Sequence, residues 1–133
     1  MYMAKAPGSV VNWNGAGNVW FKIFEEGGKV DSTGIHFHTG TTRSTHYMTC
    51  KLTNAGLSSV NARIPRGVPN GEYLVRVEHV ALHKPGQPQF YVACGQVRVS
   101  GGGGGSPGPK VAFPGVYSKS SPSFTYNMYS GGM

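Results

Sequence analysis

Charge is scarce in this chain, and acidic residues are scarcest. Only 13% of the 133 residues are charged, with five Asp and Glu against twelve Lys and Arg, for a formal charge of +7. No run of about eighteen apolar residues is present, so no helix could cross a membrane and one soluble domain is expected. The chain also opens without the charged-then-apolar pattern of a signal peptide, and we expect no secretion address in the sequence as it stands.

Helix-forming residues are also few, whereas 21 glycines and nine prolines are present. This balance favours a loop-rich β protein over a helical enzyme, because Ala, Glu, Lys and Leu are the residues that stabilise helices. We expect a mostly β chain in which helix accounts for less than about a tenth of the residues. A length of 133 residues suits a single domain, 1–133, with a modest core.

The basic charge does not indicate a nucleic-acid partner. Lysines and arginines are spread singly along the chain and form no run interleaved with stacking aromatic residues. A solvated surface accounts for such scattered charge. We therefore expect no nucleic acid and no membrane among the partners.

The chain has two cysteines, Cys50 and Cys94, which lie too far apart in the sequence for a CxxC redox or zinc motif. A bridge between them needs Cα atoms within about 7 Å, which the sequence cannot establish. Cys94 lies in an apolar run with Phe90 and Val92, and we expect it to be buried there.

Strand patterns alternate with turn signals along the chain. Apolar residues recur at period two, or form Val/Leu-rich runs between glycines and prolines, in five segments; these lie near residues 1–6, 19–24, 59–64, 72–82 and 88–100. Residues 28–58 show no sustained period, and we expect a long irregular connection with about one strand. The glycine-rich segment 101–109 is expected to be a flexible crossover that does not divide domains.

A polar cluster is predicted around the turn between the last two of these strands. Gln89 and Tyr91 are two residues apart and share one face, and His83 lies just across the turn. An imidazole, an amide and a phenol could form a hydrogen-bonded cluster at the end of a sheet. They could also surround a metal whose main ligands lie elsewhere, and the residues alone favour the plain hydrogen-bonded cluster while leaving both alternatives open.

The motifs around this cluster resemble one enzyme family. "MYMAKAPGSV", "NVWFKIFEEGG", "YLVRVEHVALH", "QFYVACGQVRVSGG" and "PGPKVAFPGVY" follow in the order seen in fungal lytic polysaccharide monooxygenases of auxiliary activity family nine. The similarity covers most of the chain outside residues 29–58. It implies an all-β, immunoglobulin- or fibronectin-like β-sandwich, incomplete and with long loops. It also implies a secreted enzyme that uses copper, an oxygen co-substrate and an electron donor to cleave cellulose or related β-1,4-glucans.

The resemblance assigns roles to four residues. His83 and Gln89 match the second-sphere network for oxygen, where such groups hydrogen-bond and move protons, and Tyr91 matches the axial position of the copper. Tyr117 matches a tyrosine near the substrate surface, where a ring can stack on a sugar, although a core role suits it equally well.

The family's copper ligands have no counterpart here. They are the amine and imidazole of an N-terminal histidine, with a second histidine shortly before the "VYMAK"-like strand, whereas this chain begins at that strand with Met1. The resemblance therefore implies a chain that binds copper poorly and is inactive alone, and that lacks the cysteine partner of Cys94. The alternative is a non-catalytic secreted β module that binds polysaccharide.

Three further histidines are candidate ligands. His36 and His38 share one face of any strand there, but two imidazoles without a third ligand are more often surface residues. His79 falls on the same strand face as His83, and we interpret it as structural or solvated.

Overall fold

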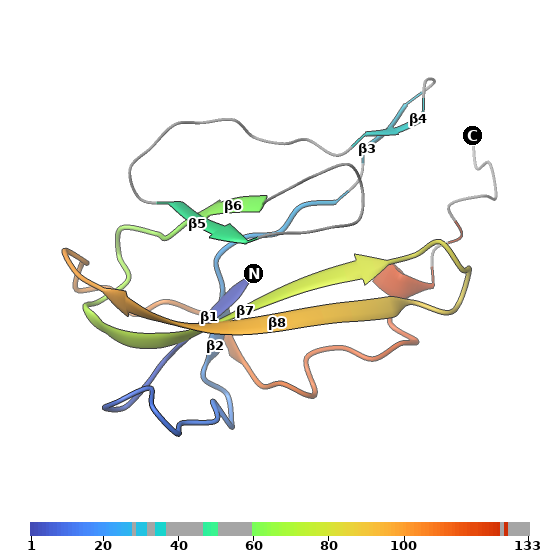
Figure 1. The fold of residues 1–133 in the computed structure, drawn as a ribbon. Helices are drawn as coiled ribbons and strands as arrows, with labels where there is room; N and C mark the ends of the chain where they lie inside the picture. The colour runs from blue at the N-terminus through green and yellow to red at the C-terminus, as the bar shows by residue number, and fades with distance from the viewer. Residues whose placement is uncertain (28, 32–33, 37–46, 51–59, 126, 128–133) are drawn as a thin grey trace.

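A computed structural model of the chain describes residues 1–27, 29–31, 34–36, 47–50, 60–125 and 127, with side chains described outside 28–60. Five strands form one antiparallel sheet in the order β8-β7-β1-β2-β9 (Figure 1). Their bounds are β1 Tyr2–Lys5, β2 Trp20–Lys22, β7 Gly71–Ala81, β8 Gln89–Val99 and β9 Lys110–Val111. In the described part of the chain, helix is limited to the 3-10 turn η1, Pro122–Phe124. No helix among these residues is long and apolar enough to span a membrane.

The hairpin of β7 and β8 dominates the sheet. Its register pairs Gly71 with Val99 at one end and Ala81 with Gln89 at the other, so both strands are eleven residues long. Residues 82–88 turn the chain between them, where Gly86 takes a positive φ of 70°. This long, regular pairing fixes which residues of the two strands lie opposite each other.

Alternation along the strands creates two apolar layers, one on each face of the sheet. On β7, Tyr73, Val75 and Val77 are buried on one face, whereas Leu74 belongs to the other. The first layer also contains the buried side chains of Met1, Met3, Phe21, Ala62 and Val68. The second contains Tyr2, Ala4 and Trp20, with Trp13, Val19, Val111 and Phe113 against them. Burial on both faces explains why β1 and β2 contain so few polar residues.

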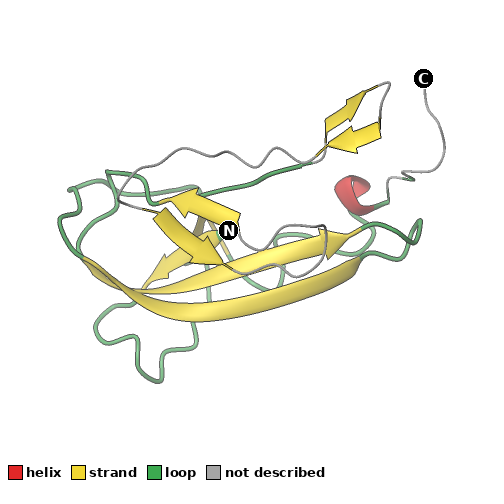
Figure 2. Ribbon diagram, turned by 45° about the horizontal axis from the view of Figure 1, so that its top comes forward, coloured by secondary structure: helices red, strands yellow, loops and turns green. Residues whose placement is uncertain are grey.

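Two short ribbons lie apart from the main sheet (Figure 2). They pair β3 Lys29–Asp31 with β4 Gly34–His36, and β5 Tyr47–Cys50 with β6 Val60–Arg63. Ala62 of β6 is fully buried in the first apolar layer, so the β5–β6 ribbon packs over that face of the main sheet. Because β3, β4 and β5 all lie within residues 28–58, the expectation of about one strand there was wrong. Ribbons of three or four residues are too short to produce a readable period in the sequence. The fold is all-β and of the sandwich type, as expected.

The glycine-rich segment 101–109 has neither helix nor strand, but it is held against the turn at residues 66–70. The N–H groups of Gly103 and Gly105 donate to the carbonyls of Val68 and Gly67 at 3.0 and 2.9 Å. Side chains at these glycines would occupy the space of that turn. Composition alone predicted a flexible crossover and gave no sign of these contacts.

Cys94 is exposed and its thiol is free, so the expectation of burial was wrong. Phe90 is half-buried on the same face of β8, but Val92 between them is 45% exposed. Alternation assigned Cys94 correctly to a face, but along this part of β8 the described residues do not cover that face. The side chain of Cys50 lies outside the described residues.

Candidate functional site

Gln89 and Tyr91 form a hydrogen-bonded pair at the turn end of β8. The Tyr91 hydroxyl donates to Gln89 Oε1 at 2.9 Å, as expected for two side chains on one face of a strand. Tyr91 is 48% exposed. Its hydroxyl proton is committed to Gln89, so the lone pairs of its oxygen and the amide N–H groups of Gln89 stay available to other groups.

His79 is the imidazole that lies next to this pair. The hairpin register places it directly opposite Tyr91, and the two rings lie 6.0 Å apart between centroids at 34°. The strand face of His79 predicted only a structural or solvated residue, because a face does not show which residue of the neighbouring strand lies opposite. The signal was present in the matched lengths of the two strands, since a hairpin closed at Ala81 and Gln89 brings His79 to Tyr91.

His83 is exposed in the turn, two residues beyond the end of β7. Within the described residues no hydrogen bond joins it to Gln89 or Tyr91. The structure therefore joins two members of the predicted trio directly and leaves the third in the loop beside them.

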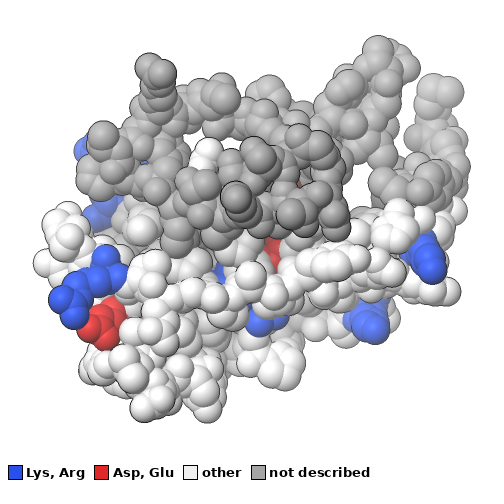
Figure 3. Space-filling view, viewed as in Figure 1, with Lys and Arg blue, Asp and Glu red and all other residues white. Residues whose placement is uncertain are grey.

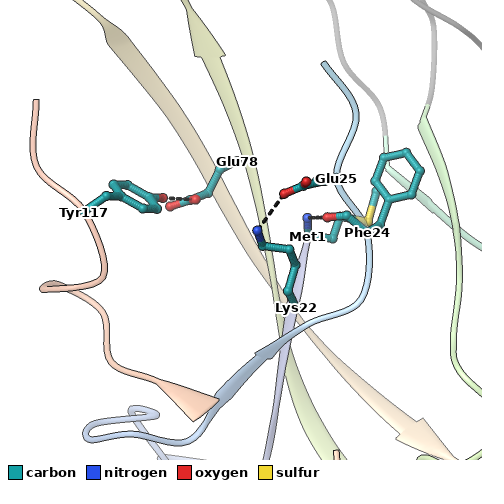
Figure 4. Close-up of polar contacts among 6 residues, drawn as sticks. All are labelled: Met1, Lys22, Phe24, Glu25, Glu78 and Tyr117. Atoms are coloured by element: carbon teal, nitrogen blue, oxygen red, sulfur yellow. Dashed lines mark hydrogen bonds and ion pairs between the residues drawn. The ribbon is translucent and has the colours of Figure 1, made fainter. Parts of the chain in front are cut away.

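Glu78 carries a second polar network on the opposite face of β7. Its carboxylate accepts Arg76 Nε and Nη2 at 2.9 and 2.6 Å and the hydroxyl of Tyr117 (Figure 4). The guanidinium carbon of Arg76 also lies 4.4 Å from the ring centroid of Phe113. With its side chain only 9% exposed, Glu78 is a nearly buried carboxylate whose charge is satisfied by a paired arginine and a phenol.

Tyr117 belongs to an aromatic cluster that holds the C-terminal segment on the sheet. Its half-buried ring stacks on Phe90 with centroids 5.8 Å apart and 9° between the planes. Phe113 and Phe124 meet the same ring edge-on at 5.8 and 5.2 Å. These ring contacts and the hydrogen bond to Glu78 engage most of the Tyr117 side chain, both its ring and its hydroxyl.

The donors around Tyr91 do not fit a primary copper site. Cu(II) prefers about three nitrogen donors in one plane, and the described residues contain no group of three or more His, Cys, Asp or Glu side chains that could hold a metal. The Met1 amine is also engaged elsewhere, since it donates to the Phe24 carbonyl at 2.6 Å (Figure 4). His36 and His38 lie outside the residues whose side chains are described.

The all-β sandwich places the chain in the class of polysaccharide monooxygenase folds. The crystal structure of a cellulose-active polysaccharide monooxygenase from M. thermophila superposes with a TM-score of 0.76 at 34% identity, covering 96% of this chain and 56% of that one. Residues 1–133 match Auxiliary Activity family 9 (formerly GH61). The chain belongs to this family.

Curated relatives show the same membership. The chain is 44% identical over 131 residues to AA9 family lytic polysaccharide monooxygenase C of Emericella nidulans, covering 96% of this chain and 50% of the relative. It is 41% identical over 133 residues to AA9 family lytic polysaccharide monooxygenase H of Malbranchea cinnamomea, with 96% and 51% covered. The chain thus spans about half the length of these two relatives.

Proposed function

We propose that this chain serves the copper-dependent oxidative cleavage of cellulose or related β-1,4-glucans, and that it contributes the surroundings of the metal but not its primary ligands. The observation that supports this is the Tyr91–Gln89 hydrogen bond on an exposed strand of a chain that belongs to Auxiliary Activity family 9. An external electron donor and a secreted setting are part of the same proposal.

The proposal gives each residue of the site a role, and the contacts of Gln89, Tyr91 and Tyr117 support theirs. Gln89 accepts the Tyr91 hydroxyl proton and so orients the phenol, whose oxygen would be a weak donor to copper if the metal were held beside it. The amide N–H groups of Gln89, which have no partner among the described residues, and the exposed imidazole of His83 could donate hydrogen bonds and protons to a bound oxygen co-substrate. Tyr117 would contact glucan only through the open part of its ring, and its bond to Glu78 supports a role in holding the surface in place.

The chain alone is expected to bind copper weakly and to release no oxidised oligosaccharides from cellulose in the presence of a reductant. Calorimetry with Cu(II) and chromatography of the soluble products test both points. A single site with sub-micromolar affinity would contradict the proposal, as would oxidised products that disappear in Tyr91→Phe or His83→Ala. His36, His38 and His79 would then be the first ligands to test.

A fusion protein tests the proposed glucan cleavage separately from the weak copper binding expected of residues 1–133 alone. The half of the Emericella nidulans relative that this chain does not cover would be joined to residues 1–133. We expect the fusion to release oxidised oligosaccharides and Gln89→Ala to reduce their yield, with Gln87→Ala in the exposed turn as the matched control. A folded, copper-loaded fusion whose yield is unchanged by Gln89→Ala would refute the role of Gln89.

The second candidate function is a non-catalytic module that binds polysaccharide. The exposure of Tyr91, which is 48% exposed beside His79, favours it, because an exposed aromatic ring can stack on a sugar. Depletion of the chain from solution by cellulose, without copper or reductant, measures this binding. Tyr91→Phe keeps the ring and should keep the binding, whereas Tyr91→Ala should lose it.

A further inference from the structure

Few of the neighbours of Tyr91 in the hairpin can hold its side chain. Its neighbours on that face come from β8 itself and from β7 across it; they are Gln89, Ala93, Val77, His79 and Ala81. The two alanines end at Cβ, and the valine is buried in the first apolar layer. Among these neighbours, Gln89 and His79 alone carry side chains long enough to reach the phenol.

Charged side chains of the hairpin do not support Tyr91 either. Residues 89–97 contain no charged residue, and in the view of Figure 3 the surface along most of β8 is uncharged. On β7, Arg76 and Glu78 pair with each other and lie on the opposite face from His79. Within the part of the chain that the structure describes, Tyr91 is thus held by one neutral hydrogen bond and one ring contact.

These two contacts constrain different parts of the Tyr91 side chain. The hydroxyl donates to Gln89 Oε1 at 2.9 Å, which fixes the position of the oxygen. The imidazole of His79 lies 6.0 Å from the phenol ring between centroids, at 34°, within the range of about 4.5–7 Å that is typical of aromatic pairs. This second contact fixes the plane of the ring, so the two together constrain both side-chain torsion angles of Tyr91.

We propose that His79 is a positioning residue for Tyr91 and holds the phenol ring so that its hydroxyl meets Gln89 at one place. The consequence for glucan cleavage rests on the function proposed above, in which the Tyr91 oxygen is a weak donor beside copper. Groups of a catalytic site must be held within about 0.5 Å of the productive geometry. His79 acts in this role as a flat ring, so a ring without nitrogen atoms can replace it.

The first test is NMR of the Gln89 side-chain amide in residues 1–133 without copper. Gln89 is bonded to Tyr91 and lies opposite Ala81, not opposite His79, so its signal reports the hydrogen bond. Tyr91→Phe keeps the ring and removes the hydroxyl, and it gives the position of the signal when the bond is absent. We expect His79→Ala to move the Gln89 signal toward that position and His79→Phe to keep it at the native one.

Control variants separate positioning from stability. His83→Ala removes an exposed imidazole from the adjacent turn and should leave the Gln89 signal in place. His79→Val is a second variant without a ring, and valine favours a strand, so it should fold even if alanine weakens β7. Urea unfolding followed by Trp20 fluorescence confirms that each variant is folded. A merely structural His79 would lower the urea midpoint on substitution and leave the Gln89 signal of the folded state unmoved.

The second test is the yield of oxidised oligosaccharides from the copper-loaded fusion. His79→Ala should lower it by about tenfold or more, and His79→Phe should restore it. The proposal would be overturned by a Gln89 signal that stays in place in both variants without a ring, that moves as far in His83→Ala, or that His79→Phe does not restore. An active fusion whose yield is unchanged by His79→Ala would overturn the role in cleavage. A fusion that cleaves no glucan would refute the proposed function alone, because the Gln89 measurement needs neither copper nor glucan and still decides the positioning role.

Discussion

Gly103→Ala tests whether the glycine-rich segment is held as the structure shows. A Cβ at this position would lie 2.6 Å from the carbonyl oxygen of Arg66 and 3.1 Å from the Cα of Gly67. Both are backbone atoms, which cannot move aside as a side chain can. A Cβ at the neighbouring Gly104 would meet no atom within 4 Å, so Gly104→Ala is a matched control.

The cost follows from the displacement that the new methyl group forces. Real Cβ atoms essentially never approach closer than 3.0 Å, so the segment must move by about 0.4 Å or more. That shift stretches the Gly103 N–H bond to the Val68 carbonyl, now 3.0 Å, and the Gly105 bond to Gly67, now 2.9 Å. Each such bond contributes about 1 kcal/mol net. We therefore expect Gly103→Ala to lower the free energy of unfolding by about 1–2 kcal/mol.

The assay is urea unfolding followed by the fluorescence of Trp20, which is 4% exposed in the native state. The midpoint should fall in Gly103→Ala with an unchanged slope, which identifies a change of stability and not of compactness. Gly104→Ala should be neutral or stabilising by about 0.4–1 kcal/mol, because alanine restricts the unfolded chain. Equal midpoints for the two variants would refute the reasoning and show that the segment is free.

Two further predictions concern pH. Burial raises the pKa of Tyr73 above 10.0, so the contribution of its neutral phenol to stability is complete below pH 10 and is lost as the pH rises above that value. Tyr73→Phe should therefore flatten the decline of the urea midpoint at alkaline pH. The same variant loses the hydrogen bond from Tyr73 to the Pro69 carbonyl, which should lower the free energy of unfolding by about 1 kcal/mol at neutral pH. Hydrogen bonds from the Val10 N–H and from Arg98 lower the pKa of Glu72 below 4.5. The contribution of the Glu72 carboxylate to stability is therefore complete above pH 4.5 and is lost as the pH falls through the lowered pKa. Glu72→Gln should reduce the slope of the urea midpoint against pH in that acid range, and an unchanged slope would contradict this.

The sequence by itself determined the β class, the long strands and the pairing of Gln89 with Tyr91. These follow from local rules: alternation gives the face of each residue, turn residues bound the strands, and a spacing of two places side chains together. The ordered motifs also identified the family. All of this information lies within short stretches of chain, which is why one sequence sufficed.

Only the tertiary structure decided what covers each face. Cys94 was assigned to a face but wrongly to the interior, because alternation does not say whether anything packs there. Tyr117 turned toward Glu78, 39 residues away in the sequence, and the glycine segment bonded to a turn more than 30 residues before it. Such contacts depend on how distant strands pair and stack, which no local pattern encodes.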